Sequence, residues 1–342
     1  MNPPYSVIKY NDLIESNLRE FILDKDFPLY LMMKYHLGWV EQDGSPSDTV
    51  ARPINDYFVG ALSLIVNNVL GGNTKEAIPS ALATVLVQNS SFIHQDIQDG
   101  TPERNSRPTL WWIWGPAQAI NAGDGMHAMG RLALLNNSYE SLPPQQSLKA
   151  ISALDKACLD ICEGQFLDLN YTERVDINLE NYMQMIGNKN ASLVKYSAVL
   201  GAISVGSDED TIMNIAEYGF KLGLSMKIRN DILDLWQRDH KSGLSGDILG
   251  KKKLLPIVYA LQNAKGIDKH TLGDIYFKRS MENKDIELLL DVLDSIGAKQ
   301  YTQGIADSLM QESMSCLANL NIDEEARNEL ANVATYFSIK DI

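Results

Sequence analysis

Cysteine and histidine are scarce in this chain of 342 residues, which contains 3 Cys and 5 His. Three cysteines cannot form a disulfide framework, and the four-residue spacing of Cys158 and Cys162 is a helical repeat, not a metal knuckle. His94 has no Cys or second His at ligand spacing. We therefore expect neither a disulfide scaffold nor a zinc site.

Positive charge is also in short supply. The chain has 30 Lys and Arg against 44 Asp and Glu, which leaves a formal net charge of -14. A surface of this average charge repels nucleic acid and anionic membranes, so we expect neither as a partner.

Long apolar runs are missing as well. The best candidate, residues 57–70, is interrupted by Asn67 and Asn68 and falls short of the ~18 residues that a spanning helix needs. The first residues, from Met1 to Tyr5, show no basic segment followed by an apolar run, so no secretory signal is recognised. We expect a cytoplasmic protein without a transmembrane segment.

The chain does contain apolar residues in helical repeats. Its composition, 45% apolar and 22% charged, is that of a folded globular protein. Apolar residues recur at intervals of three and four, as in Leu82, Val85 and Leu86, and alternating strand patterns are scarce. Gly- and Pro-containing breaks separate segments of about 15 to 30 residues. The pattern predicts an all-α bundle, and the absence of linkers and repeats predicts a single domain over residues 1–342.

Two clusters of carboxylates stand at the ends of apolar helical segments. In each, two Asp residues are three positions apart, Asp96 with Asp99 and Asp231 with Asp234, so that both can project from one helix face. Oxygen ligands in this arrangement suit Mg²⁺ shared with substrate phosphates. Each cluster is followed by basic residues that could bind an anion. An ordinary solvated helix face is the alternative for either cluster taken alone.

Several further motifs stand in a fixed order around these clusters, and with them the chain resembles the trans-polyprenyl synthetase family over nearly its whole length. The matching stretches are residues 92–99, 107–111, 121–124, 163–165 with Asp168, 185–189, 228–234, 246–248 and 251–256. The resemblance implies an isoprenoid synthase-type helical bundle around a central cavity, with the Asp clusters facing each other across it. It also implies three Mg²⁺ ions, an allylic prenyl diphosphate as substrate, and a homodimer.

The resemblance assigns roles to individual residues. The implied Mg²⁺ ligands are Gln95, Asp96, Asp99, Asn230, Asp231 and Asp234. The implied catalytic residues are Asp96, Asp99, Asp231, Asp234 and Lys189. The implied partners of the allylic diphosphate are Arg104, Lys189 and the loop residue Lys241, which is displaced by about one position from the family pattern. Lys227 stands where the family has Gln, and it could add a cation at the diphosphate or pair with a nearby Asp.

The second diphosphate site, which the family uses for isopentenyl diphosphate, is depleted. Arg52 and Gln88 stand where the family has Arg and a His or Gln, but Thr49 replaces a Lys and Asn105 replaces the second residue of an Arg pair. Neutral side chains cannot replace the charge-assisted hydrogen bonds of two cations. We therefore expect weak binding of isopentenyl diphosphate.

The metal motifs are altered less. Gln95 and Asn230 each replace the leading Asp of their motif, and an uncharged amide oxygen holds Mg²⁺ more weakly than a carboxylate does. The second motif then begins like the Asn-Asp motif of terpene cyclases. Ser90 and Ser91 stand where bulky aromatics stop short chains in the family, which implies a deep pocket for a substrate of C15, C20 or longer.

These observations favour a Mg²⁺-dependent class I enzyme that ionises an allylic prenyl diphosphate. The leading hypothesis is a terpene cyclase on a prenyl synthase scaffold. One alternative is a chain-elongating polyprenyl diphosphate synthase or a prenyltransferase that uses another acceptor. A further alternative is a non-catalytic regulatory subunit of a heterodimeric prenyl synthase.

Overall fold

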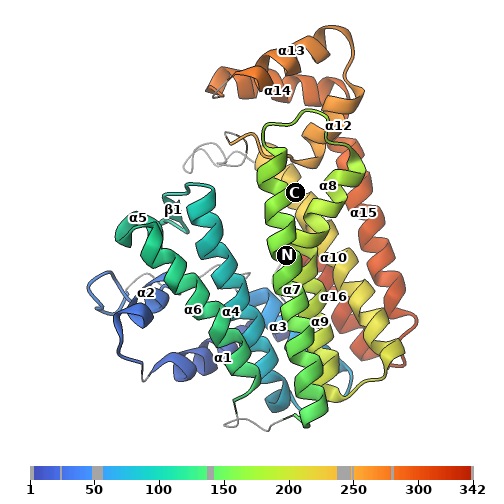
Figure 1. Cartoon of the computed structure of the whole chain (residues 1–342). Coiled ribbons are helices and arrows are strands. Elements are labelled where there is room, and N and C mark those ends of the chain that lie inside the picture. The colour runs from blue at the N-terminus through green and yellow to red at the C-terminus, as the bar shows by residue number, and fades with distance from the viewer. Residues whose placement is uncertain are drawn as a thin grey trace. The chain divides into compact units, whose positions relative to one another are not determined.

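The computed structural model describes residues 4–23, 25–47, 57–136, 142–236, 248, 250–278 and 281–339. Within these ranges helices dominate, and the one sheet is a short hairpin (Figure 1). The all-α prediction is confirmed. In this described part, no helix combines the length and apolar character needed to cross a membrane. The elements are α1 Tyr5–Leu23, α2 Pro28–His36, α3 Phe58–Val69, α4 Thr74–Gln98, β1 Glu103–Arg104, β2 Arg107–Pro108, α5 Leu110–Trp114, α6 Pro116–Leu134, α7 Pro144–Tyr171, α8 Leu179–Ile186, the π-helix η2 Gly187–Ala191, α9 Ser192–Val205, α10 Glu209–Trp236, α12 Leu255–Asn263, α13 Gly266–Phe277, α14 Asn283–Ser295, α15 Ala298–Leu317 and α16 Glu324–Ile339.

The chain forms two compact units. The first comprises Met1–Cys158, Leu193–Ala216 and Asn319–Val333, and the second comprises Leu159–Ser192, Glu217–Ala318 and Ala334–Ile342. The chain passes from one unit to the other within α7, α9, α10 and α16, and also just after the end of α15. One domain over residues 1–342 stays a prediction. Each unit carries one of the two Asp motifs.

In the first unit, α4 packs against both α3 and α6. Every residue of α3 except Asn68 is buried, as expected of a helix that is apolar on all sides. Gly60 lets α3 approach α4 closely, because a Cβ there would lie 2.9 Å from Val85 Cγ2 and 3.1 Å from the Ala81 carbonyl oxygen. This packing fixes α4, whose last turn carries the first Asp motif.

A hairpin that the sequence did not predict follows the first motif. Strands β1 and β2 pair antiparallel, with Arg104 opposite Arg107. Its two central residues both have positive φ, 52° at Asn105 and 60° at Ser106, as a type I′ turn requires. Asn adopts this conformation more readily than most residues. Asn105 thus lies at the hairpin tip, and the turn itself favours Asn at this position because it requires a positive φ.

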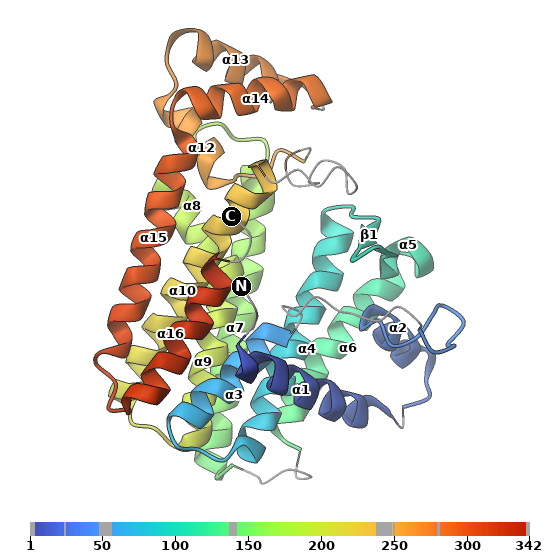
Figure 2. The same cartoon turned by 180° about the vertical axis from the view of Figure 1, so that it is seen from behind.

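In the second unit, the later turns of α10 share an apolar core with α8, α12 and α15. Tyr182, Ile186, Leu224, Ile228 and Leu255 are fully or almost fully buried there. Helices α13 and α14 pack on each other, and α14 also contacts α12 (Figure 2). The second Asp motif lies on the last two turns of α10, and its buried side is therefore packed against helices from other parts of the sequence.

Candidate active site

The first motif lies at the C-terminal end of α4, and its central carboxylate is turned into the protein. Asp96 is 2% exposed and accepts hydrogen bonds from Arg104, with Nη2 at 2.7 Å and Nε at 3.0 Å from Oδ1. The Arg104 guanidinium also stacks over Phe92, 4.7 Å from the ring centroid. Burial raises the pKa of Asp96, although Arg104 opposes the rise. Arg104, predicted to bind diphosphate, thus already has a carboxylate partner, and its side chain remains 32% exposed.

The remaining predicted residues of the first motif lie on or near the surface of α4. Gln95 is half-buried and Asp99, at the C-cap, is exposed. They are four residues apart and therefore lie on one helix face. Ser90 is buried, and half-buried Ser91 donates a 2.7 Å hydrogen bond to the Gln88 carbonyl oxygen.

The loop after the first motif is tied down by neighbouring groups. Thr109 Oγ1 and Trp111 Nε1 donate to the Thr101 carbonyl oxygen at 2.9 Å and 2.7 Å. Arg107 donates to the Val40 carbonyl oxygen at 2.7 Å and also pairs with Glu41. Residues 107–111 therefore hold the segment that carries Arg104.

The second motif has the same division between inside and outside. Asp231 is completely buried, whereas Asn230 is exposed and Asp234 is half-buried. Asp231 Oδ2 accepts hydrogen bonds from Tyr182 Oη at 2.5 Å and from the Leu255 backbone N–H at 2.7 Å. Leu255 is the first residue of α12, so the carboxylate lies at a helix N-terminus, where negative charge is favourable.

Lys227 supplies a cation to the same carboxylate. Its Nζ lies 2.7 Å from Asp231 Oδ1, one helical turn earlier on α10. The approach makes an ion pair without hydrogen-bond geometry. The sequence predicts for Lys227 either a contact with diphosphate or a pair with a nearby Asp; the pair is formed, with Asp231, and the Lys227 side chain is 17% exposed.

A second buried carboxylate in this unit gathers further lysines. Asp168 accepts a 2.6 Å hydrogen bond from Lys189 Nζ, and Lys252 Nζ lies 3.5 Å away. Burial alone would raise the pKa of Asp168, but Lys189, Lys252 and Lys227 outweigh it and lower that pKa. Three lysines thus gather around two buried aspartates, and lysine ammonium groups are common partners of phosphate ligands.

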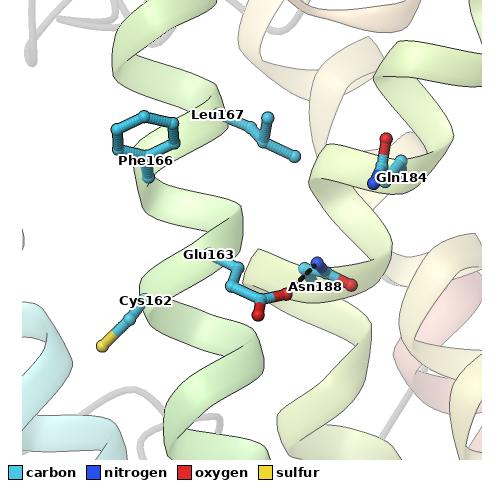
Figure 3. A pocket seen from close by; sticks show the side chains of 6 residues that line it. All are labelled: Cys162, Glu163, Phe166, Leu167, Gln184 and Asn188. Atoms are coloured by element: carbon cyan, nitrogen blue, oxygen red, sulfur yellow. Dashed lines mark hydrogen bonds between the residues drawn. The ribbon is translucent and has the colours of Figure 1, made fainter.

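Lys189 lies on η2, and a glycine on α7 allows its position. A Cβ on Gly164 would lie 2.2 Å from the Lys189 backbone nitrogen. π-helical turns often occur at functional sites. Beside this contact an open pocket of about 420 Å³ lies between α7, α8 and η2, where Figure 3 shows Glu163 and Asn188 joined by a 3.2 Å hydrogen bond. The pocket is lined by Cys162, Glu163, Phe166, Leu167, Gln184 and Asn188.

Comparison with known proteins gives the same family as the motifs. The polyprenyl synthetase family model matches residues 57–293. The chain belongs to the polyprenyl synthetase family. It is 31% identical to the geranylgeranyl diphosphate synthase of Mycobacterium tuberculosis over 293 residues, covering 85% of this chain and 81% of that one.

Solved structures give the same fold. A polyprenyl synthetase from Streptomyces coelicolor superposes with a TM-score of 0.89 at 26% identity and covers 98% of this chain and 99% of its own. A geranylgeranyl pyrophosphate synthetase from Pyrococcus horikoshii has a TM-score of 0.84 at 27% identity, covering 98% and 97%. The predicted family is confirmed, and the chain is a member of a prenyltransferase family of isoprenoid biosynthesis.

The oxygen donors of the two Asp motifs are of the kind that Mg²⁺ prefers. Each motif presents one amide and one carboxylate a helical turn apart, Gln95 with Asp99 and Asn230 with Asp234. Among the described residues, no three His, Cys, Asp or Glu side chains form a group that could hold a metal ion. Mg²⁺ commonly takes one or two carboxylates and completes its shell with water and substrate phosphates. The donor set fits that mode of binding.

The basic residues after the second motif divide between two tasks. Lys251 Nζ donates to the Tyr276 carbonyl oxygen at 3.0 Å, and Lys253 Nζ donates to the Thr172 carbonyl oxygen at 2.8 Å. Only the central one, Lys252, turns toward Asp168. The predicted residues Arg52 and Lys241, together with Thr49, lie outside the described residues.

Proposed function

We propose that this member of the polyprenyl synthetase family is a chain-elongating prenyl diphosphate synthase, which joins an allylic prenyl diphosphate to isopentenyl diphosphate and releases diphosphate. The observation that carries this proposal is the 31% identity, over 85% of the chain, to a protein named geranylgeranyl diphosphate synthase. This reverses the order of the two enzyme hypotheses drawn from the sequence.

The lysines of the second unit would bind the allylic diphosphate. Lys189, Lys227 and Lys252 are only 11% to 17% exposed, so their charges act in a partly dehydrated environment. Held in place by Asp168 and Asp231, they stabilise the charge that develops on the departing diphosphate.

Mg²⁺ would be held in the first unit by Gln95 and Asp99, and in the second unit by Asn230 and Asp234. When bound, the metal supplies further positive charge to the leaving group. We also propose that three Mg²⁺ ions bind, which is the number that the family resemblance implies.

Terpene cyclisation is the second candidate, favoured by the neutral residues at the predicted isopentenyl diphosphate site. Asn105, at the hairpin tip with φ of 52°, offers no cation where the family has Arg, and Thr49 replaces a Lys. If isopentenyl diphosphate does not bind, the allylic cation can react only with its own double bonds or with water.

One experiment distinguishes these candidates. Purified protein with Mg²⁺ is incubated with geranyl, farnesyl or geranylgeranyl diphosphate, each with and without isopentenyl diphosphate, and an EDTA-treated sample is the control. Longer prenyl alcohols after phosphatase treatment, formed only when isopentenyl diphosphate is present, are expected. Hydrocarbons formed without isopentenyl diphosphate would contradict elongation and support cyclisation. No product in any sample, together with an altered product of a partner synthase, would replace both by a regulatory subunit.

We also propose a homodimer, as the resemblance implies. Helix α7 carries four exposed apolar residues at intervals of three and four. Three of them, Leu159, Phe166 and Leu169, are at least two-fifths exposed, and the fourth is Cys162. This spacing gives one apolar face on a helix, and an exposed apolar face of this kind commonly marks an interface. Light scattering should give the mass of two chains, and Phe166→Glu should reduce it to one.

A further inference from the structure

The two Asp motifs share a pattern that the sequence alone does not reveal. Each reads amide, Asp, two spacers, Asp, and in each the middle Asp is buried while the outer two positions reach the surface. Each middle Asp is also neutralised by a cation of its own unit, Asp96 by Arg104 and Asp231 by Lys227. The predicted pair of carboxylates three residues apart is therefore split between interior and surface.

We propose that Asp231 is a positioning residue, which joins α8, α10 and α12, and that it does not ligate Mg²⁺. Its Oδ2 accepts from Tyr182 and from the Leu255 N–H, and its Oδ1 faces Lys227. None of its surface meets solvent. A metal could reach this carboxylate only by displacing donors that a buried charge needs.

The group that Asp231 positions is Lys252. Lys252 stands three residues before Leu255, whose N–H is bound to Asp231. The Asp231 carboxylate thus fixes the end of the segment from which Lys252 reaches Asp168. Tyr182 belongs to the same junction because its hydroxyl holds the carboxylate from α8. Removal of the Tyr182 hydroxyl should therefore weaken diphosphate binding. Because Tyr182 is not a metal ligand, this effect would come from the position of Lys252.

The same reasoning applies to Asp96. Both of its oxygens accept from Arg104, which fixes the β1–β2 hairpin on the end of α4. Each motif is then left with one amide and one carboxylate for Mg²⁺, namely Gln95 with Asp99 and Asn230 with Asp234. This inference rests on the proposed use of Mg²⁺ and is independent of the fate of the allylic cation.

The test uses full-length protein with Mn²⁺ as the probe, in the presence of enough inorganic diphosphate to saturate each variant, and measures free Mn²⁺ by electron paramagnetic resonance. Asp234→Asn should weaken Mn²⁺ binding by about tenfold or more, whereas Asp231→Asn and Tyr182→Phe should keep it within about twofold. The last two should both lower Tm by several degrees, since each removes a buried charge-assisted hydrogen bond. Both should also weaken binding of inorganic diphosphate measured without metal.

Tyr276→Phe is the matched control. Tyr276 is buried in the same unit, and its hydroxyl has no hydrogen-bond partner among the described residues. This variant should leave Tm and Mn²⁺ binding unchanged. Loss of Mn²⁺ binding in folded Asp231→Asn equal to that in Asp234→Asn would overturn the inference.

Two further outcomes keep the inference testable. If Asp231→Asn does not fold, Tyr182→Phe decides, because a metal affinity lowered tenfold without the tyrosine contradicts a purely positioning role. If the wild-type protein binds no Mn²⁺ even with diphosphate, the proposed function fails. In that case Tm alone tests whether Asp231 joins α8, α10 and α12. An unchanged Tm in Tyr182→Phe would overturn this positioning role.

Discussion

Tyr182 Oη donates a 2.5 Å hydrogen bond to Asp231 Oδ2, and neither side chain has any surface exposed to solvent. Burial, assisted by the negative charge of Asp231, raises the pKa of Tyr182 well above its usual range, so the hydroxyl remains a donor. One oxygen of this carboxylate, Oδ2, therefore receives its hydrogen bonds from inside the protein, while the other, Oδ1, has an ion pair with Lys227 and no hydrogen bond from the described residues. The groups that face outward from this motif are Asn230 and Asp234.

Gly164→Ala should disturb the site through the backbone. The new Cβ would lie 2.2 Å from the Lys189 nitrogen, so α7 and η2 must separate, at a cost of about 1–3 kcal/mol. Lys189 would then move relative to Asp168. We expect a lower Tm and a higher KM for the allylic diphosphate, measured by thermal unfolding and steady-state kinetics.

Gly273→Ala is the control for that variant. Gly273 is in the interior of α13, and a Cβ there would meet nothing within 4 Å. Alanine at an open helical position stabilises by roughly 0.5–1 kcal/mol. Equal effects of the two substitutions would show that the close contact between Gly164 and η2 does not position Lys189.

Lys189→Met should lose both stability and diphosphate binding. Removal of the lysine leaves Asp168 buried with a weaker partner, which costs about 3–5 kcal/mol for a buried pair, and KM should rise by about tenfold or more. The double variant Lys189→Met/Asp168→Asn should recover much of the stability without recovering KM.

That double variant separates the two roles of Lys189. A KM restored together with stability would mean that the lysine only neutralises Asp168 and does not meet the substrate. Lys149→Met serves as the control, because Lys149 forms an exposed ion pair with Glu209. Such pairs contribute little, so both Tm and KM should stay near the wild-type values.

Lys253 should make stability rise with pH in a defined window. Desolvation lowers its pKa to about 8 from the ordinary 10.5. Between these two values the unfolded chain binds up to one more proton than the folded chain, so the free energy of unfolding increases as pH rises. Below pH 8 both states hold the proton, and the contribution is constant.

Denaturant unfolding from pH 7 to 10.5 measures this slope. Lys253→Met should be less stable at neutral pH, because it loses the hydrogen bonds to the Thr172 and Lys251 carbonyl oxygens, and the Lys253 part of the slope should disappear. Lys269→Met, on the exposed surface of α13, controls for removal of a lysine. An identical pH dependence in wild type and Lys253→Met would contradict the assignment.

The family and the all-helical fold could be predicted because their signals are local. Helical spacing of apolar residues and motifs a few residues long survive in a sequence without any knowledge of partners. The roles of Asp96 and Asp231 could not be predicted in the same way. Their partners Arg104 and Leu255 are 8 and 24 residues distant, and Tyr182 is 49 residues distant. Nothing in the sequence marks Tyr182 among 14 tyrosines.

The lysine triplet shows the same limit. The sequence presents Lys251, Lys252 and Lys253 as equal anion-binding candidates. Lys251 instead has a left-handed backbone, with φ of 55°, and donates to the Tyr276 carbonyl near the end of α13. Lys253 donates to the Thr172 carbonyl just after the end of α7. Such cation contacts to C-terminal carbonyls are favourable, and they depend on helices that the local sequence does not specify.

Substrate length is the property that a single substitution can test most directly. Ser90 is buried, so a large residue there would be expected to disturb the packing of α4. Ser91 is half-buried and donates a hydrogen bond to a carbonyl of its own helix, so Ser91→Phe should fold. If Ser91 lines the chain pocket, the phenyl ring should shorten the products by one or more isoprene units. Analysis of phosphatase-released alcohols, with Ser91→Ala as control, measures this. Products of unchanged length from a folded, active Ser91→Phe would show that Ser91 does not face the growing chain.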